Sequence, residues 1–280
     1  MMTTGDEIGH GHGHGHGHVE IGDAAIDEAI GHYRVHGWAR LGRIAGEETL
    51  VSLRERADAI MMGQVTYEGL FFQHDSETGK YEDLAYGQGW KGPSLEYRKV
   101  EKLEKDPLFL AWLSNDVFRR VAARVYGGDA GVALYRAFIM NKHAGGGSDL
   151  PWHQDGGNFW GLDRDPVLQI WTALDDAPTD GGCLEVVDGT HAAGLATPLG
   201  GVVPKDHVER RDAEVHALRL PVVAGEVIIL HNHLWHRSGR THLGKPRRAL
   251  SVCYMDDATQ CRRKKRAPRA FVRVWPAPVK

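Results

Sequence analysis

Residues 151–156 read Pro151-Trp152-His153-Gln154-Asp155-Gly156, and this short stretch constrains both the fold and the chemistry. In an extended strand, residues i and i+2 point to the same face, so the side chains of His153 and Asp155 converge while Gln154 points away. An imidazole and a carboxylate on one face of a strand can bind a metal ion together. The motif therefore predicts a metal-binding strand, but a site of this type needs a further histidine from a later strand.

The sequence around this motif has the pattern of a mainly β protein. From Val132 onward, short apolar or β-branched runs are bounded by glycine, proline, aspartate or asparagine, which is typical of a sandwich or barrel. The predicted strands are Leu134–Met140, Leu168–Leu174, Cys183–Val187, Val215–Leu220, Val227–Leu230 and Ala249–Tyr254. We expect an α+β protein, mainly β, in which N-terminal helices pack against a β-barrel.

Three helices are expected before this β region. Asp23 can cap a helix that ends before Gly37. Apolar residues at helical spacing predict two further helices, over residues 47–62 and about 107–125. Residues 63–92 are rich in glycine, aromatic and charged residues without clear periodicity, and we interpret them as a long structured loop.

The composition is that of an ordinary globular protein. The chain has 280 residues, 42% of them hydrophobic and 25% charged, and a formal net charge of −3. This charge gives no global electrostatic reason to expect nucleic acid or a membrane surface as a partner. No apolar run approaches the ~20 residues that span a bilayer. Because three scattered cysteines cannot form a disulfide framework, a reducing cytoplasm is the expected location.

The two ends of the chain differ from the rest. Residues 9–18 alternate glycine and histidine, so residues 1–20 are interpreted as a disordered leader whose histidines do not belong to the site. The run Arg262-Arg263-Lys264-Lys265-Arg266 lies in a basic tail, residues 261–280, which is expected to be solvated. Residues 21–260 are then expected to form a single domain.

The second histidine of the metal site has three candidates. His231, His233 and His236 follow the buried strand predicted at Val227–Leu230. One ligand position needs only one of them, and the others are expected to be hydrogen-bonded loop residues. Spacing alone does not choose among the three.

An arginine and a serine after these histidines suggest a second ligand. Ser238 follows His236 closely, and Arg247 opens the strand that comes next. A dicarboxylate that chelates a metal at one end needs a cation at the other. Arginine holds a carboxylate with two parallel hydrogen bonds, and a neighbouring hydroxyl adds a neutral donor.

At these residues the sequence resembles the phytanoyl-CoA dioxygenase family of iron(II)- and 2-oxoglutarate-dependent oxygenases. The resemblance covers roughly residues 130–255 and rests on Asn141-Lys142, Trp152-His153-Gln154-Asp155-Gly156, Gln169-Ile170-Trp171-Thr172-Ala173-Leu174-Asp175, Gly181-Gly182-Cys183-Leu184-Glu185-Val186-Val187, Gly189-Thr190-His191, and His236-Arg237-Ser238-Gly239 with Arg247.

The resemblance implies a double-stranded β-helix, the cupin-like jelly roll, with its core at about residues 130–255. It implies His153, Asp155 and His236 as ligands of Fe(II), and O2 as the oxidant. The co-substrate 2-oxoglutarate would be held by Arg247 and Ser238, with help from Lys99 and Trp171. The chain departs from the family pattern at Lys142-His143-Ala144-Gly145, where lysine-proline-proline-glycine is common, and at Arg237, which replaces a common glycine.

The substrate pocket is the least defined part of the expectation. Its candidate lining residues are Trp152, Asn158, Phe159, Trp160, Gln169 and Trp171. The basic residues Lys99, Lys142 and Arg237 suggest an anionic small molecule. Halogenating relatives lack the metal-binding carboxylate, so the presence of Asp155 favours hydroxylation. The alternatives are an oxygenase that acts on nucleic acid, a metal-binding jelly roll without chemistry, and a zinc hydrolase.

Overall fold

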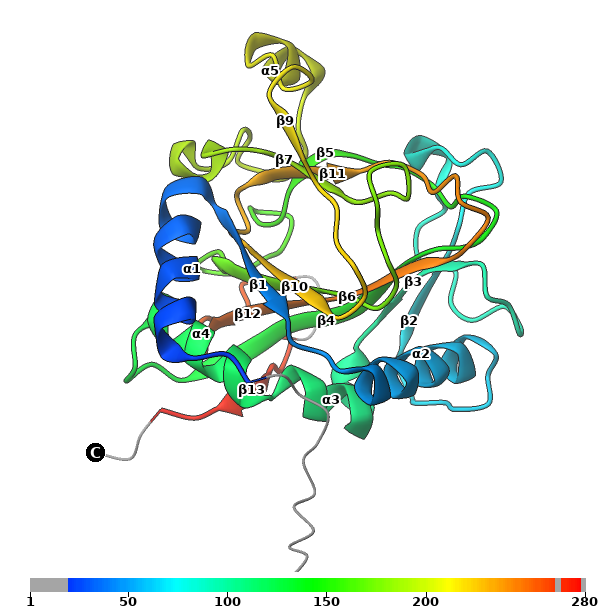
Figure 1. Cartoon of the computed structure of the whole chain (residues 1–280), viewed down its shortest axis with the longest axis horizontal. Helices are drawn as coiled ribbons and strands as arrows, with labels where there is room; N and C mark the ends of the chain where they lie inside the picture. Colours follow the sequence, from blue (N-terminus) through cyan, green and yellow to red (C-terminus); the bar gives the residue numbers. More distant parts are fainter. Residues whose placement is uncertain (1–19, 265–267, 278–280) are drawn as a thin grey trace, which may run out of the picture.

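The structure is a computed structural model that describes residues 20–264 and 268–277. The glycine-histidine leader expected at residues 1–20 therefore lies, except for Glu20, outside the described residues. Two antiparallel sheets face each other, and helices cover the outer side of the larger one (Figure 1). This is the jelly-roll arrangement expected from the sequence.

The large sheet contains most of the strands. In spatial order it consists of β1 (Trp38–Arg43), β10 (Glu226–Leu230), β6 (Leu168–Ala173), β12 (Arg247–Asp256), β4 (Val132–Lys142), β3 (Tyr97–Glu101) and β2 (Phe71–His74), and β13 (Val272–Trp275) also pairs with β4. The strand β13 lies within the predicted C-terminal tail. Its pairing with β4 shows that this part of the tail is a strand of the sheet rather than a solvated segment.

The small sheet contains most of the metal-binding motif predicted at residues 151–156. Its order is β8 (Gly201–Val202), β5 (Leu150–Gln154), β11 (Trp235–Ser238), β7 (Leu184–Val187) and β9 (Ala217–Leu220). The short helix α5 (Lys205–Arg210) and β9 extend away from the helix-covered side of the molecule (Figure 1). The central strands β5 and β11 lie side by side, which brings two distant parts of the sequence together.

The N-terminal helices form because their apolar residues share one face. The first, α1 (Asp23–His36), buries Ile26, Ile30 and Tyr33, and it ends at Gly37, which adopts a φ of 81°. The expectation that Asp23 caps this helix is wrong: Gly22 occupies the cap position without a side-chain hydrogen bond. The second helix is α2 (Glu47–Met61), close to the range expected.

The helix expected at 107–125 is two helices, α3 (Pro107–Leu113) and α4 (Asp116–Tyr126). The side chain of Asp106 accepts hydrogen bonds from the first turn of α3, and the side chain of Asn115 does the same for Phe118 N in α4. Such caps start new helices because they satisfy the free backbone N–H groups of the first turn.

The core between helices and sheet is apolar, and side chains from α1 to α4 pack there against the large sheet. Residues 63–92, expected to be a loop, include β2 and the 3-10 turn η1 (Tyr81–Asp83). Two further 3-10 turns are η2 (Leu103–Lys105) and η3 (Thr190–Ala193). In the described part of the chain, no helix is both long and apolar enough to cross a membrane.

Candidate metal centre

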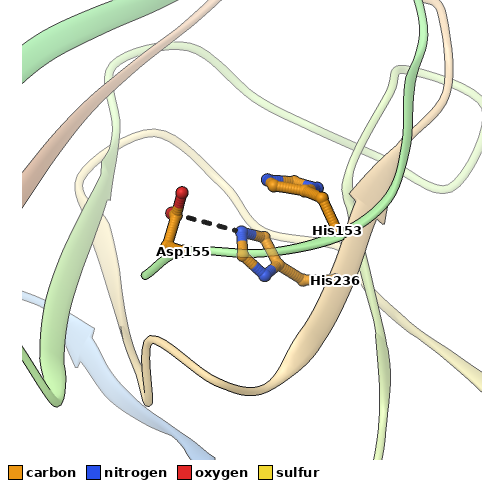
Figure 2. Close-up of side chains that lie close together, drawn as sticks. All are labelled: His153, Asp155 and His236. Atoms are coloured by element: carbon orange, nitrogen blue, oxygen red, sulfur yellow. Dashed lines mark ion pairs between the residues drawn. The ribbon is translucent and has the colours of Figure 1, made fainter. Parts of the chain in front are cut away.

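Three side chains meet on the inner face of the small sheet. The strands β5 and β11 are antiparallel, and His153 and His236 are direct partners in their register. Asp155 follows β5 and is held by a hydrogen bond from its backbone N–H to the Asn232 carbonyl, 2.8 Å. The ligand atoms of the three residues lie within 4.8 Å of one another, and Figure 2 shows them converging from the two strands. The arrangement fits a single metal ion.

The two imidazole rings are oriented for metal binding. The Nδ1 atom of His153 lies 2.9 Å from the Pro151 carbonyl oxygen, and Nδ1 of His236 lies 2.9 Å from the Leu234 carbonyl oxygen. A carbonyl oxygen only accepts hydrogen bonds, so each Nδ1 carries the proton and donates it. This leaves the lone pair of each Nε2 atom free for a metal, as in other sites where outer hydrogen bonds fix the ligand tautomer.

The charges at the site also suit a cation. Burial opposes ionisation of Asp155, but Arg136 and the two histidines outweigh it and hold the pKa of this carboxyl group well below its usual range. The Arg136 Nη2 atom donates to Asp155 Oδ1 at 2.7 Å. Burial, with a contribution from His236, lowers the pKa of His153 to about 3. At neutral pH the site therefore presents an ionised carboxylate and a neutral His153, the protonation states that metal binding requires.

A cavity of about 890 Å³ opens next to the three ligands. All three line it, together with many residues that the sequence suggested: Ser238, Arg247, Lys99, Trp171, Gln169, Phe159 and Trp160. Its size is within the range of pockets that enclose small-molecule ligands, roughly 300–1,000 Å³.

A buried positive charge lies at one end of this cavity. Arg247, at the start of β12, is 2% exposed, and its Nε atom has no hydrogen-bond partner. No described carboxylate lies within 4.0 Å of its guanidinium, although that group lies 5.9 Å from the Trp171 ring. Burial lowers the pKa of Arg247 to about 10, so it remains charged at neutral pH. A buried cation without a counter-ion is costly unless a bound anion compensates it.

A second buried arginine was missed by the sequence analysis. In the pairing of β3 with β2, Lys99 and Tyr97 have partners but Arg98 between them has none. Arg98 therefore forms a β-bulge next to Lys99. Both side chains consequently line the cavity. Arg98 is 5% exposed, two of its guanidinium nitrogens have no hydrogen-bond partner, and its charge acts on Arg247. A bulge depends on strand pairing, so only the polar pair Arg98-Lys99 was visible in the sequence.

Lys99 occupies a different part of the cavity from Arg247. Its Nζ atom forms an ion pair with Glu101 and lies 4.4 Å from the centre of the Phe138 ring. Its charge acts on Asp155, at the metal end. Of Arg98 and Lys99, it is Arg98 whose charge acts on Arg247.

Four of the predicted pocket residues do not line the cavity. Trp152 and Arg237 adjoin His153 and His236 in their strands, so they point to the opposite face of the small sheet. There the Arg237 guanidinium stacks 4.4 Å from the Trp152 ring and forms ion pairs with Glu185 and Glu214. The other two predicted pocket residues are Lys142, whose buried Nζ atom donates to the Ser148 carbonyl, and Asn158, which is exposed.

The remaining candidate histidines have other contacts. His233 forms an ion pair with Asp165, with 3.0 Å between Nε2 and Oδ2. His231 packs between His191 and Tyr33, with ring centres 5.0 Å and 6.0 Å away. Neither belongs to the group around Asp155 that could hold a metal ion, whereas His236 does.

The fold and the site define a non-haem oxygenase of the iron(II)- and 2-oxoglutarate-dependent class. A family model described as Phytanoyl-CoA dioxygenase (PhyH) matches residues 33–249, and the chain belongs to this family. The phytanoyl-CoA dioxygenase of Arabidopsis thaliana is 23% identical over 252 residues, covering 80% of this chain and 87% of that protein. A rice relative, phytanoyl-CoA dioxygenase 1, is 24% identical over 82% of this chain and 89% of its own length.

Solved structures support the fold. The epimerase SnoN from nogalamycin biosynthesis, described as non-haem and α-ketoglutarate-dependent, superposes with a TM-score of 0.68 at 16% identity, covering 92% of this chain and 98% of that one. EctD from S. alaskensis, solved with 2-oxoglutarate and 5-hydroxyectoine, also gives a TM-score of 0.68, at 18% identity, with 94% and 89% covered.

Proposed function

We propose that this protein hydroxylates a small-molecule substrate, consuming 2-oxoglutarate and O2 and releasing succinate and CO2. The observation that carries the proposal is the buried, unpaired guanidinium of Arg247 in the cavity that the three metal ligands also line. A zinc hydrolase or a jelly roll without chemistry has no need of this anion site. A dicarboxylate that chelates the metal through its keto-acid end would place its far carboxylate on this arginine.

In this proposal, His153, Asp155 and His236 hold Fe(II), and the iron supplies the oxidising chemistry together with 2-oxoglutarate and O2. The protein's own part is to position and to shield. Arg247 and Ser238 bind the far carboxylate of 2-oxoglutarate, and Arg98 adds a second charge beside it. Trp171 forms a wall against which the co-substrate lies. Arg136 donates to one oxygen of Asp155, so the other oxygen would be available to bind the metal.

The proposal is tested by 2-oxoglutarate binding to the iron-loaded protein under anaerobic conditions, measured by calorimetry. We expect Arg247→Ala to weaken binding by about tenfold or more, because a charge-assisted, bidentate contact is lost. Arg247→Lys should weaken it less, because the charge remains without the fork geometry. Arg240→Ala is the matched control, because Arg240 lies nearby in the chain but does not line the cavity. The affinity of this variant for 2-oxoglutarate should equal that of wild type. Equal affinities in all four proteins would contradict the proposal.

We also propose that the protein is cytoplasmic and that residues 21–260 form a single oxygenase domain. The presence of Asp155 supports hydroxylation over halogenation, because a halide needs the position that this carboxylate would occupy.

A further inference from the structure

Basic side chains from the C-terminal segment reach the wall of the active-site cavity. Arg263 and Arg269 follow β12 and precede β13, and both line the cavity. The sequence suggested an anionic substrate from Lys99, Lys142 and Arg237, but the last two point elsewhere. Part of the positive charge of the cavity wall therefore comes from residues that were not expected there.

The two arginines are held in place by aromatic neighbours. The Arg269 guanidinium lies 4.6 Å from the Tyr135 ring, and its Nη2 atom donates to the Tyr135 carbonyl at 2.7 Å. The Arg263 Nη2 atom donates to the Trp160 carbonyl at 3.4 Å. Tyr135 and Trp160 themselves stack, with ring centres 4.2 Å apart and planes at 7°. This packing orders the arginines in advance and so lowers the entropy cost of binding a ligand.

Within the part of the chain that the structure describes, these arginines have few hydrogen-bond partners. A guanidinium has five N–H donors, and each of the two donates one hydrogen bond to a described residue, at a backbone carbonyl. Among the described residues, neither has a carboxylate within 4.0 Å; Arg273, farther along the segment, is paired with Asp257. Two cavity carboxylates interact with Arg269 at longer range: Glu101, which already contacts Lys99 and Arg136, and Glu104. Free guanidinium forks in a cavity wall are suited to an oxyanion.

This basic wall is connected to the metal site. In the pairing of β4 with β12, Tyr135 has no partner. It forms a second bulge, and both Tyr135 and Arg136 line the cavity. The Arg136 guanidinium contacts Asp155 on one side and lies 4.5 Å from the Trp160 ring on the other. Arg136 thus links the three candidate metal ligands to the stacked Tyr135–Trp160 pair, which contacts Arg263 and Arg269.

The cavity also offers apolar surface near its entrance. Phe159 is 64% exposed and Tyr86 is 80% exposed, and both line the cavity. Exposed aromatic rings and arginines without ion-pair partners in the wall of one cavity fit a ligand with an apolar body and a charged end.

We propose that Arg263 and Arg269 form an oxyanion subsite that selects substrates carrying a carboxylate, phosphate or sulfonate group on an apolar or aromatic body. This proposal rests on the proposed oxygenase function. It gives the segment after β12 a role in specificity, since it supplies the two charges that the barrel strands do not.

The test uses the protein loaded with Fe(II) and 2-oxoglutarate without oxygen, so that the site at Arg247 is already filled. The probes are naphthalene-2-carboxylate, naphthalene-2-sulfonate and 2-naphthyl phosphate, with the neutral naphthalene-2-carboxamide as their matched analogue. Binding is measured by calorimetry for wild type, for the Arg263→Gln/Arg269→Gln double variant, and for Arg262→Gln. Arg262 is the control because it is exposed and does not line the cavity.

We expect wild type to prefer at least one anionic probe to the carboxamide, and the best of the three identifies the oxyanion. The double variant should lose about tenfold or more in affinity for that probe, while its affinity for the carboxamide should stay within twofold of wild type. Arg262→Gln should behave as wild type, and Arg269→Lys should keep part of the preference.

Two outcomes would overturn the subsite. One is a wild type that binds the anions no better than the carboxamide, or binds none of them at millimolar concentration. The other is a double variant that binds both kinds of probe equally more weakly, which would indicate a structural role. A wild type that does not bind 2-oxoglutarate before any probe is added would contradict the oxygenase proposal, and this result is distinct from the two above.

Discussion

His153 and His236 are direct partners in the register of β5 and β11, and their ring centres lie 4.0 Å apart. This pairing makes the metal site a property of the small sheet. A shift of one residue in β11 would turn His236 to the opposite face, where Trp152 and Arg237 pack. Because Asp155 is tied to the Asn232 carbonyl just before β11, the same two segments position all three ligands.

The pairing predicts which histidine binds the metal. His236→Ala should weaken Co(II) or Fe(II) binding by at least about 100-fold, because even the loss of an outer-shell partner commonly costs 10–100-fold. His233→Ala is the matched control: its ring pairs with Asp165, so metal affinity should change little. Anaerobic metal titration with a competing chelator gives both values. A His233 variant that loses the metal while the His236 variant keeps it would refute the assignment.

The bulge in β3 predicts that Arg98 contributes more to 2-oxoglutarate binding than Lys99. Two guanidinium nitrogens of Arg98 have no hydrogen-bond partner and its charge acts on Arg247, whereas Lys99 forms an ion pair with Glu101. Calorimetric titration should show about tenfold weaker 2-oxoglutarate binding for Arg98→Gln, and a smaller change for Lys99→Gln. The reverse order would favour the role that the family resemblance implied for Lys99.

The boundary between η2 and α3 predicts a stability effect. The carboxylate of Asp106 is fully buried, accepts two hydrogen bonds from the first turn of α3 and pairs with Arg56. Asp106→Ala should lower the free energy of unfolding by about 2–4 kcal/mol, since it removes the cap and the ion pair together. Asp106→Asn keeps an acceptor for the cap and should cost less. Urea denaturation measures both variants, and equal losses would mean that the cap contributes nothing.

The partly buried ring of His231 predicts a pH dependence of stability. Burial, with the charges of His233 and His191, lowers its pKa from 6.5 to about 3. Between pH 3 and 6.5, His231 is protonated in the unfolded chain but not in the folded chain. The stability that depends on neutral His231 is therefore complete above about pH 6.5 and is lost as the pH falls towards 3. His231→Gln should therefore flatten the fall in stability by up to about 1.4 kcal/mol per pH unit in this window.

The control for that experiment is His207→Gln on the surface helix α5, which should leave the slope of wild type. Denaturant unfolding at a series of pH values provides the comparison. Identical slopes for wild type and His231→Gln would show that this ring does not titrate on unfolding.

The strands and ligands were predictable where a local rule sufficed. The period-2 rule paired His153 with Asp155, and apolar runs marked β4, β6 and β10. The same rule also excludes Trp152 from the cavity, since it adjoins His153, but bulk and aromaticity favoured it as a pocket residue. Local rules failed where strand pairing decides the structure. The strand β3 is short and rich in charge, and β13 has only four residues; both pair with β4.

The parts of the site that the sequence did not reveal depend on long-range geometry. Arg98 lines the cavity because of one bulge, and Tyr135 and Arg136 share the cavity because of another. Arg269 reaches the cavity because β13 returns to β4, so a run interpreted as a solvated tail supplies part of the wall. None of these relationships has a periodic signal along the chain.

One cavity is proposed to hold Fe(II) and 2-oxoglutarate together. Anaerobic titration of the metal-free protein with both, followed by visible absorption, tests this directly. We predict a weak charge-transfer band that needs both ligands and saturates at one equivalent of iron, and then succinate release when oxygen is admitted. Iron binding without any band at saturating 2-oxoglutarate would contradict it.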